Sequence, residues 1–343
     1  MATNFISTGL SGAVFGSALL LSGVYSPTII LAQLELSDFY MLKVFLTASG
    51  SSAILMEICK RANIAPCKPR EASNLNLLSR YDGNIIGGLI LGCGMALTGA
   101  CPGTVLVQVA SGISSGVPVL AGGILGGILW SRFGYCVKCA PTTPASEKGS
   151  TLSKNELTLY DSTKMSSAQA VLLFEIVCLS VIIAASYLLP DPYGSKLLNP
   201  VLGGLLIGGA QAASLILTRG PIGVSTAYER LGDYICRFAG LSPCYDSTWP
   251  SPSPLVFALG MIVGTWSLSH ALGMTPVMES TQISVARAAV GGVALIIGAR
   301  TAGGCTSGHG ISGMAALSTA SFATVGAMFA GGMGLSGLLR FFK

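Results

Sequence analysis

Long apolar stretches alternate with short polar ones along the whole chain. Most are about 18 to 22 residues long, enough for a helix to cross a hydrocarbon core of about 30 Å. Nine spanning segments are predicted: 9–33, with a break near 23–27, and 40–58, 83–100, 117–136, 168–189, 200–218, 254–274, 282–300 and 322–341. Four shorter apolar pieces, 26–36, 102–115, 221–236 and 308–319, follow breaks that contain glycine or proline. These pieces are too short to span and are predicted to be half-helices or re-entrant helices.

The composition supports this interpretation. Hydrophobic residues make up 51% of the chain and charged residues only 10%, whereas a soluble globular protein has about 25% charged residues. The fold class is therefore predicted to be an all-α polytopic membrane protein. No basic region precedes the first segment, so we expect it to stay as a helix and not to be removed as a signal peptide.

The distribution of lysine and arginine predicts the orientation in the membrane. One set of alternate loops and segment ends carries Lys60, Arg61, Lys68, Arg70, Arg80, Arg132, Lys138, Lys148, Lys154, Lys164, Arg219, Arg230, Arg237 and Arg300. The other set carries only Lys43, Lys196, Arg287, Arg340 and Lys343. Since cytosolic loops are enriched in these residues, we expect a cytosolic N-terminus and an outside C-terminus. The net charge of +5 lies in these loops, so it does not indicate a nucleic-acid partner.

Two stretches of the chain share one pattern of glycine and cysteine. Gly-Ala-Cys-Pro-Gly at 99–103 and Gly-Cys-Thr-Ser-Gly-His at 304–309 each follow an apolar segment, and each cysteine lies seven residues after a glycine. We predict two membrane repeats, 1–136 and 200–343, joined by a cytosolic loop and one linker helix in 137–199. One odd linker helix inverts the second repeat, and paired re-entrant turns of this kind line an hourglass-like pathway in transporters.

The two turns are the candidate substrate site. Pro102 is suited to the first position of a short helix, and the N-termini of short helices attract anions. A thiol is a weak donor that can hold an anion and release it. The candidate residues at the two turns are Cys101, Pro102, Gly103, Gly304, Cys305, Thr306, Ser307 and His309, with Cys93 two turns upstream of Cys101.

Other chemistry has little support in the sequence. No combination of nucleophile, base and acid, no phosphate-binding loop and no cluster of metal ligands is recognisable, so we expect no enzyme activity, cofactor or metal. Cys136 and Cys139 have redox or metal spacing, but a lone pair of this kind is a weak signal. A membrane thiol-redox protein is kept as an alternative.

The signatures at 99–103 and 304–313 resemble those of the YeeE/YedE sulfur transport family. The resemblance implies an hourglass-like transporter with nine spanning and four short helices that takes up thiosulfate past cysteine thiols at its waist. A cytosolic sulfurtransferase is a candidate recipient of the substrate. One departure concerns the first broken segment, where the family's thiosulfate transporters have a further pathway cysteine and this chain has Ser22 to Pro27 without one. Ser22 and Tyr25 are the candidate replacements.

The function predicted from the sequence is a permease for a small sulfur-containing anion, with thiosulfate as the first choice. A channel for another small anion or a neutral solute is the alternative of the same broad class. Both belong in a lipid bilayer.

Overall fold

The structure is a computed structural model that describes residues 2–65, 68–75, 77, 79–138, 157–163, 165–189, 198–240, 249–273 and 283–341. Within these ranges the chain is helical and contains no strand beyond one isolated bridge. The long helices are α1 (Ala2–Leu21), α3 (Tyr40–Arg61), α4 (Asp82–Thr98), α6 (Gly116–Lys138), α8 (Ser167–Leu188), α9 (Pro200–Thr218), α11 (Ser253–Ala271), α12 (Val285–Thr301) and α13 (Thr319–Phe341). The short ones are α2 (Pro27–Leu34), α5 (Pro102–Ala110), α7 (Leu159–Thr163), α10 (Ser225–Phe238) and the π-helical turn η2 (Ser307–Gly313).

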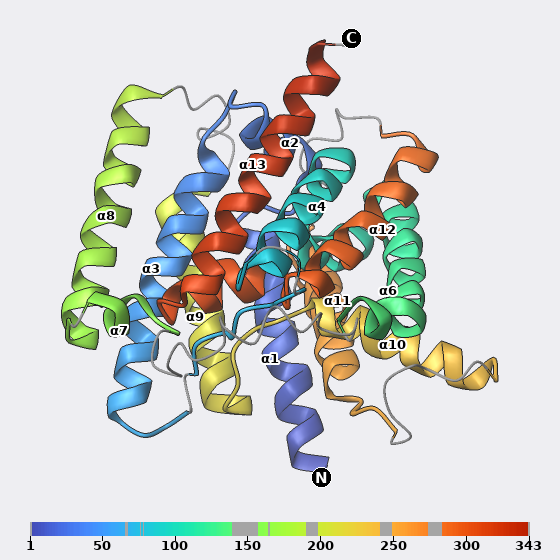
Figure 1. The fold of residues 1–343 in the computed structure, drawn as a ribbon, viewed down its shortest axis with the longest axis horizontal. Helices are drawn as coiled ribbons and strands as arrows, with labels where there is room; N and C mark the ends of the chain where they lie inside the picture. The colour runs from blue at the N-terminus through green and yellow to red at the C-terminus, as the bar shows by residue number, and fades with distance from the viewer. Residues whose placement is uncertain are drawn as a thin grey trace.

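Each of the nine predicted segments overlaps one long helix, although α1 begins at Ala2 and ends at Leu21, before the predicted break. Seven stretches are long and apolar enough to cross a membrane, with α4 and α5 counted as one of them, and α1 adds a shorter apolar helix, Phe5–Leu21. The remaining long helix, α12, has 17 residues. The prediction of an all-α polytopic membrane protein is therefore confirmed. Figure 1 shows the two ends of the chain at opposite ends of the bundle, as an odd number of spans requires. Which end faces the cytosol stays a prediction.

The four short apolar pieces are also present, as α2, α5, α10 and η2. Proline occupies the first turn of α2 and α5, where its missing N–H leaves no hydrogen bond unmade. The prediction missed α7, which lies in the part of 137–199 that we expected to be a cytosolic loop. Backbone hydrogen bonds join Leu159 to Leu317 and Thr319 to Leu157, so contacts distant in sequence hold this short helix.

The equivalent helices α4 and α12 cross in opposite directions. A side chain at Gly94 would meet the backbone nitrogen of Leu295, and one at Gly298 would meet that of Leu91. Each residue of the first pair lies 204 positions from its counterpart in the second. As the residue number rises along α4 it falls along α12, so the helices run antiparallel. Antiparallel equivalent helices are what an inverted repeat produces.

Other pairs of packed helices are also related by the repeat. Gly12 and Gly16 of α1 bring its backbone onto α11, and Gly204 and Gly208 of α9 bring its backbone close to α3. Likewise α4 packs against α13 while α12 packs against α6. Small residues let helix backbones approach closely in a membrane. These glycine pairs therefore bring helix backbones together, whereas the boundaries at 136 and 199 stay predictions.

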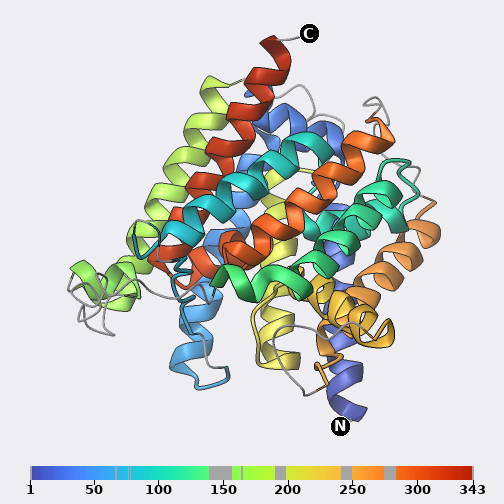
Figure 2. The ribbon, with the colours of Figure 1, turned by 45° about the vertical axis from the view of Figure 1, so that its right-hand side comes forward.

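The helix α8 lies apart from the two repeats, at the edge of the bundle beside α3 (Figures 1 and 2). Its outward face is strongly apolar. At least half of the surface of each of these side chains is exposed: Leu172, Leu173, Ile176, Val177, Leu179 and Ile183. Exposed aliphatic side chains in such numbers fit lipid and not water as the surrounding solvent. Much of the predicted linker, 139–156 and 190–197, lies outside the described residues.

Candidate functional site

Both cysteine turns begin with a glycine in a left-handed conformation. Gly99 has a φ of 58° and Gly303 a φ of 83°, and the two residues lie 204 positions apart. Residues other than glycine rarely adopt this conformation. Gly99 is also restricted by contact, since an added Cβ would lie 2.8 Å from the Cβ of Pro27. The two turns therefore share a backbone conformation as well as a sequence pattern.

Cys101 caps the N-terminus of α5. Its backbone N–H donates to Oγ1 of Thr104 at 2.7 Å, and the backbone N–H of Thr104 donates to its sulfur at 3.4 Å. This is a capping box in which a thiol takes the usual place of a hydroxyl. The carbonyl of the next residue, Pro102, accepts a hydrogen bond of 2.9 Å from the hydroxyl of Tyr228 on α10. The Cys101 turn is therefore fixed both locally and from the other repeat.

Cys305 is 1% exposed, and polar groups lie near its sulfur. The Ser307 hydroxyl lies 3.2 Å from the sulfur, and the backbone N–H groups of Gly308, Ser225 and Val224 are near enough to interact with it electrostatically. These donors come from the starts of η2 and α10, where N–H groups lack partners within the helix. Hydrogen-bond donors therefore converge at Cys305, as expected for a place that attracts an anion.

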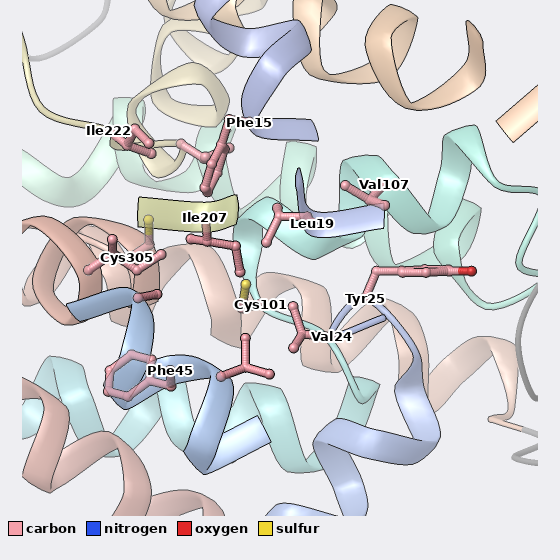
Figure 3. Packing of buried hydrophobic residues seen from close by; sticks show 14 of the residues in the cluster. Phe15, Leu19, Val24, Tyr25, Phe45, Cys101, Val107, Ile207, Ile222 and Cys305 are labelled. Carbon is pink, nitrogen blue, oxygen red and sulfur yellow. The ribbon is translucent and has the colours of Figure 1, made fainter. Parts of the chain in front are cut away.

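A cavity of about 50 Å³ lies between the two turns. A water needs about 10–15 Å³ on this measure, so the cavity has room for only a few atoms. Its lining is almost entirely apolar and comes from both repeats: Phe15, Leu19, Val24, Met41, Val44, Phe45, Ala48, Cys101, Gly103, Thr104, Ile207, Thr306, Ser307 and Ile311. In Figure 3 the sulfur of Cys101 points toward Ile207, and Cys305 lies on the opposite side of Ile207.

The cavity brings several of the predicted residues together. Cys101, Gly103, Thr306 and Ser307 line it, and Cys305 belongs to the same buried cluster as Cys101. Pro102 and Gly304 are buried beside these residues within the two turns. The part of the candidate site at the two signatures is thus contiguous in space.

The predicted replacements in the first broken segment do not line this cavity. The hydroxyl of Ser22 donates to the carbonyl of Leu19 at 2.9 Å. It therefore satisfies a carbonyl in the last turn of α1. The ring of Tyr25 points away from Cys101 (Figure 3). Val24 lines the cavity instead, which makes this part of the waist apolar.

Cys93 and His309 also lie outside the lining. The Cys93 thiol faces α13 and donates to the carbonyl of Gly331 at 3.6 Å, because residues two turns apart on a helix need not share a face. Both ring nitrogens of His309 have protein partners, namely the carbonyl of Ala302 at 3.1 Å and the hydroxyl of Ser321 at 3.0 Å. In this arrangement His309 holds the turn and has no nitrogen left for a substrate.

Sequence reasoning missed Arg70, which the positive-inside argument treats only as a topological charge. It lies in the connection between α3 and α4 and reaches the Cys305 turn. Its Nε donates to the carbonyl of Gly308 at 2.7 Å, and its Nη1 donates to that of Gly303 at 2.9 Å. No local pattern signals this contact, since more than 230 positions separate the partners.

The Cys136 and Cys139 pair cannot be placed. The structure describes the backbone but not the side chain of Cys136, and Cys139 lies outside the described residues. The six cysteines that it does describe are free thiols: Cys59, Cys93, Cys101, Cys178, Cys236 and Cys305.

Comparison with known families gives one match. Residues 21–334 match the family model described as "Sulphur transport". The matched region extends from the end of α1 into α13 and includes both cysteine turns and every residue that lines the cavity except Phe15 and Leu19. A comparison with curated proteins finds no match.

Proposed function

Since this chain belongs to the sulphur transport (YeeE/YedE) family, we propose that it takes up thiosulfate, or a closely related small sulfur anion, through the waist between the Cys101 and Cys305 turns. Family membership makes the protein a transporter of sulfur compounds in a lipid bilayer. The observation that supports the proposed route is the shared cavity, because residues of both turns line it.

The physical character of the waist supports a small sulfur anion. The cavity admits only a few atoms, which suits a compact ion better than a sugar or an amino acid. Sulfur is large and polarisable, so a sulfur anion tolerates apolar walls and thiol contacts better than a strongly hydrated ion does. The neutral donors around Cys305 supply partial positive charge that attracts the anion. We propose that the ion is relayed from one thiol to the other.

The direction of transport follows from the predicted orientation. With the N-terminus in the cytosol, the Cys101 turn is reached from outside and the Cys305 turn from the cytosol. The ion would then meet Cys101 first and leave past Cys305. Delivery to a cytosolic sulfurtransferase stays a prediction.

Uptake of labelled thiosulfate into vesicles that contain the purified protein tests the proposal. Cys101→Ala and Cys305→Ala should each lower uptake about tenfold, because loss of one hydrogen bond to a charged ligand costs at least about 1.4 kcal/mol. Cys178→Ala removes a buried thiol from α8, outside the cavity, and should leave uptake unchanged. Normal uptake by both waist variants would exclude the thiol relay.

Two further measurements separate the alternatives. Sulfate, sulfite and selenate as competitors show whether the waist prefers another anion, and a saturable flux of a neutral solute would indicate a channel. Cysteine-to-serine variants test the redox alternative. Serine keeps a hydrogen-bond donor but cannot form a disulfide, so partial uptake by the serine variants favours a donor role over thiol redox chemistry.

A further inference from the structure

Arg70 places a guanidinium directly on the Cys305 turn. An added Cβ at Gly304 would lie 2.8 Å from Nη1, and one at Gly308 would lie 2.7 Å from Nη2. These two glycines therefore let the flat guanidinium lie against the backbone on both sides of Cys305 in sequence. The positive charge also lies within electrostatic range of the Cys305 sulfur.

This charge has no carboxylate partner among the residues that the structure describes. The nearby cation Arg300 differs, since it is paired with Glu229. A guanidinium has five N–H donors, and the two bonds to the carbonyls of Gly303 and Gly308 use only part of them. A part-buried charge without a counter-ion is unfavourable, so the remaining donors and the charge are available for an anion.

We propose that Arg70 is a substrate-binding residue that holds the transported anion at the Cys305 end of the waist. The inference rests on the proposed function, in that the anion is the one that the protein transports. The Cys305 turn supplies neutral donors and Arg70 supplies the full charge. A guanidinium can bind two oxygens of an oxyanion at once, so it favours an anion with several oxygens over chloride.

A purely structural role for Arg70 makes a different prediction. If Arg70 only clamps the two carbonyls, any variant that loses its fork-shaped geometry should destabilise the turn, with or without an anion. Arg70→Lys keeps the charge and loses the fork, whereas Arg70→Gln keeps a donor and loses the charge. The two variants therefore separate charge from geometry.

The experiment measures thermal unfolding of the full-length protein in detergent, titrated with thiosulfate or sulfate at constant ionic strength in a chloride background. The control is Arg287→Gln, because Arg287 is also partly buried and donates to a backbone carbonyl, that of Ala96, at 2.8 Å. Arg70→Gln should raise the concentration of oxyanion for half-maximal stabilisation roughly ten- to hundredfold, because it removes one charge-assisted hydrogen bond to the anion. Arg70→Lys should raise it only severalfold, and Arg287→Gln should not raise it.

Three other results would overturn the inference. If Arg70→Gln leaves the oxyanion concentration for half-maximal stabilisation unchanged, the charge of Arg70 does not contribute to binding. If the lysine and glutamine variants raise that concentration equally, Arg70 only clamps the turn. If Arg70→Gln does not fold, the lysine variant decides in the same way. Absence of stabilisation of the unmodified protein by either oxyanion also refutes it. If sulfate stabilises the protein through Arg70 and thiosulfate is not taken up, the proposed substrate fails while the role of Arg70 stands.

Discussion

The capping box at Cys101 provides a sharp test of how the first turn is held. Thr104→Val keeps the shape and volume of the side chain and removes its hydroxyl. That hydroxyl accepts the backbone N–H of Cys101 at 2.7 Å, and Thr104 is 3% exposed. The substitution therefore leaves the Cys101 N–H buried without a partner, while the bond from the Thr104 backbone to the sulfur can persist.

The expected loss of stability follows from that one unpaired group. A buried donor without a partner costs about 1–3 kcal/mol, and replacement of threonine by valine creates no cavity that would add to it. At about 2 °C per kcal/mol for a chain of this size, the unfolding midpoint should fall by about 2–6 °C. Uptake should fall as well, because Cys101 loses a constraint on its position.

Thr265→Val is the matched control. Thr265 on α11 is fully buried, and its hydroxyl has no hydrogen-bond partner among the described residues. Its removal should leave the midpoint unchanged or raise it slightly, because an unpaired buried hydroxyl is itself unfavourable. Thermal unfolding of both variants in one detergent measures the difference. Equal midpoints for the two variants would refute the capping argument.

Three further substitutions test helix packing and the contacts that fix the turns. Gly298→Ala should destabilise the protein by about 1–3 kcal/mol, because its Cβ would clash with the backbone of α4. Gly326→Ala on α13 meets nothing within 4 Å and should stabilise by up to about 1 kcal/mol; the opposite order of unfolding midpoints would contradict this. Gln108→Leu should cost about 1–3 kcal/mol, since Nε2 of Gln108 donates to the carbonyls of Tyr25 and Gly99 at 2.8 and 3.0 Å. An unchanged midpoint would show that these carbonyls need no such donor.

The two halves hold their broken segments with different residues. In the first half Gln108 alone bridges Tyr25 and Gly99. In the second half the Ser312 hydroxyl lies 3.0 Å from Oε1 of Gln211 and 3.1 Å from the carbonyl oxygen of Ile222, and it can donate its one proton to either. Both arrangements tie a short helix to the break before another short helix. The repeats therefore share a backbone plan, while the side chains that satisfy it differ.

The helices were largely predictable because their causes are local. A run of apolar residues long enough for the bilayer predicts a spanning helix, and Pro27 or Pro102 marks the start of a short one. The local signal failed at α7, whose bonds reach Leu317 and Thr319. It also gave no sign that η2 is a π-helix. That turn is rich in glycine, and its carbonyls at Gly308 and Gly310 accept side-chain donors from elsewhere in the chain.

The sequence alone determined the membrane class, the positions of the helices and the two cysteine turns, since apolar run length and glycine placement act within a few residues. Only the tertiary structure decided which residues share the cavity. It placed Val24 there in place of Ser22 and Tyr25, and it engaged both nitrogens of His309 within the protein. It also brought Arg70 to Cys305. Such contacts depend on how whole helices pack, and no pattern within one segment encodes them.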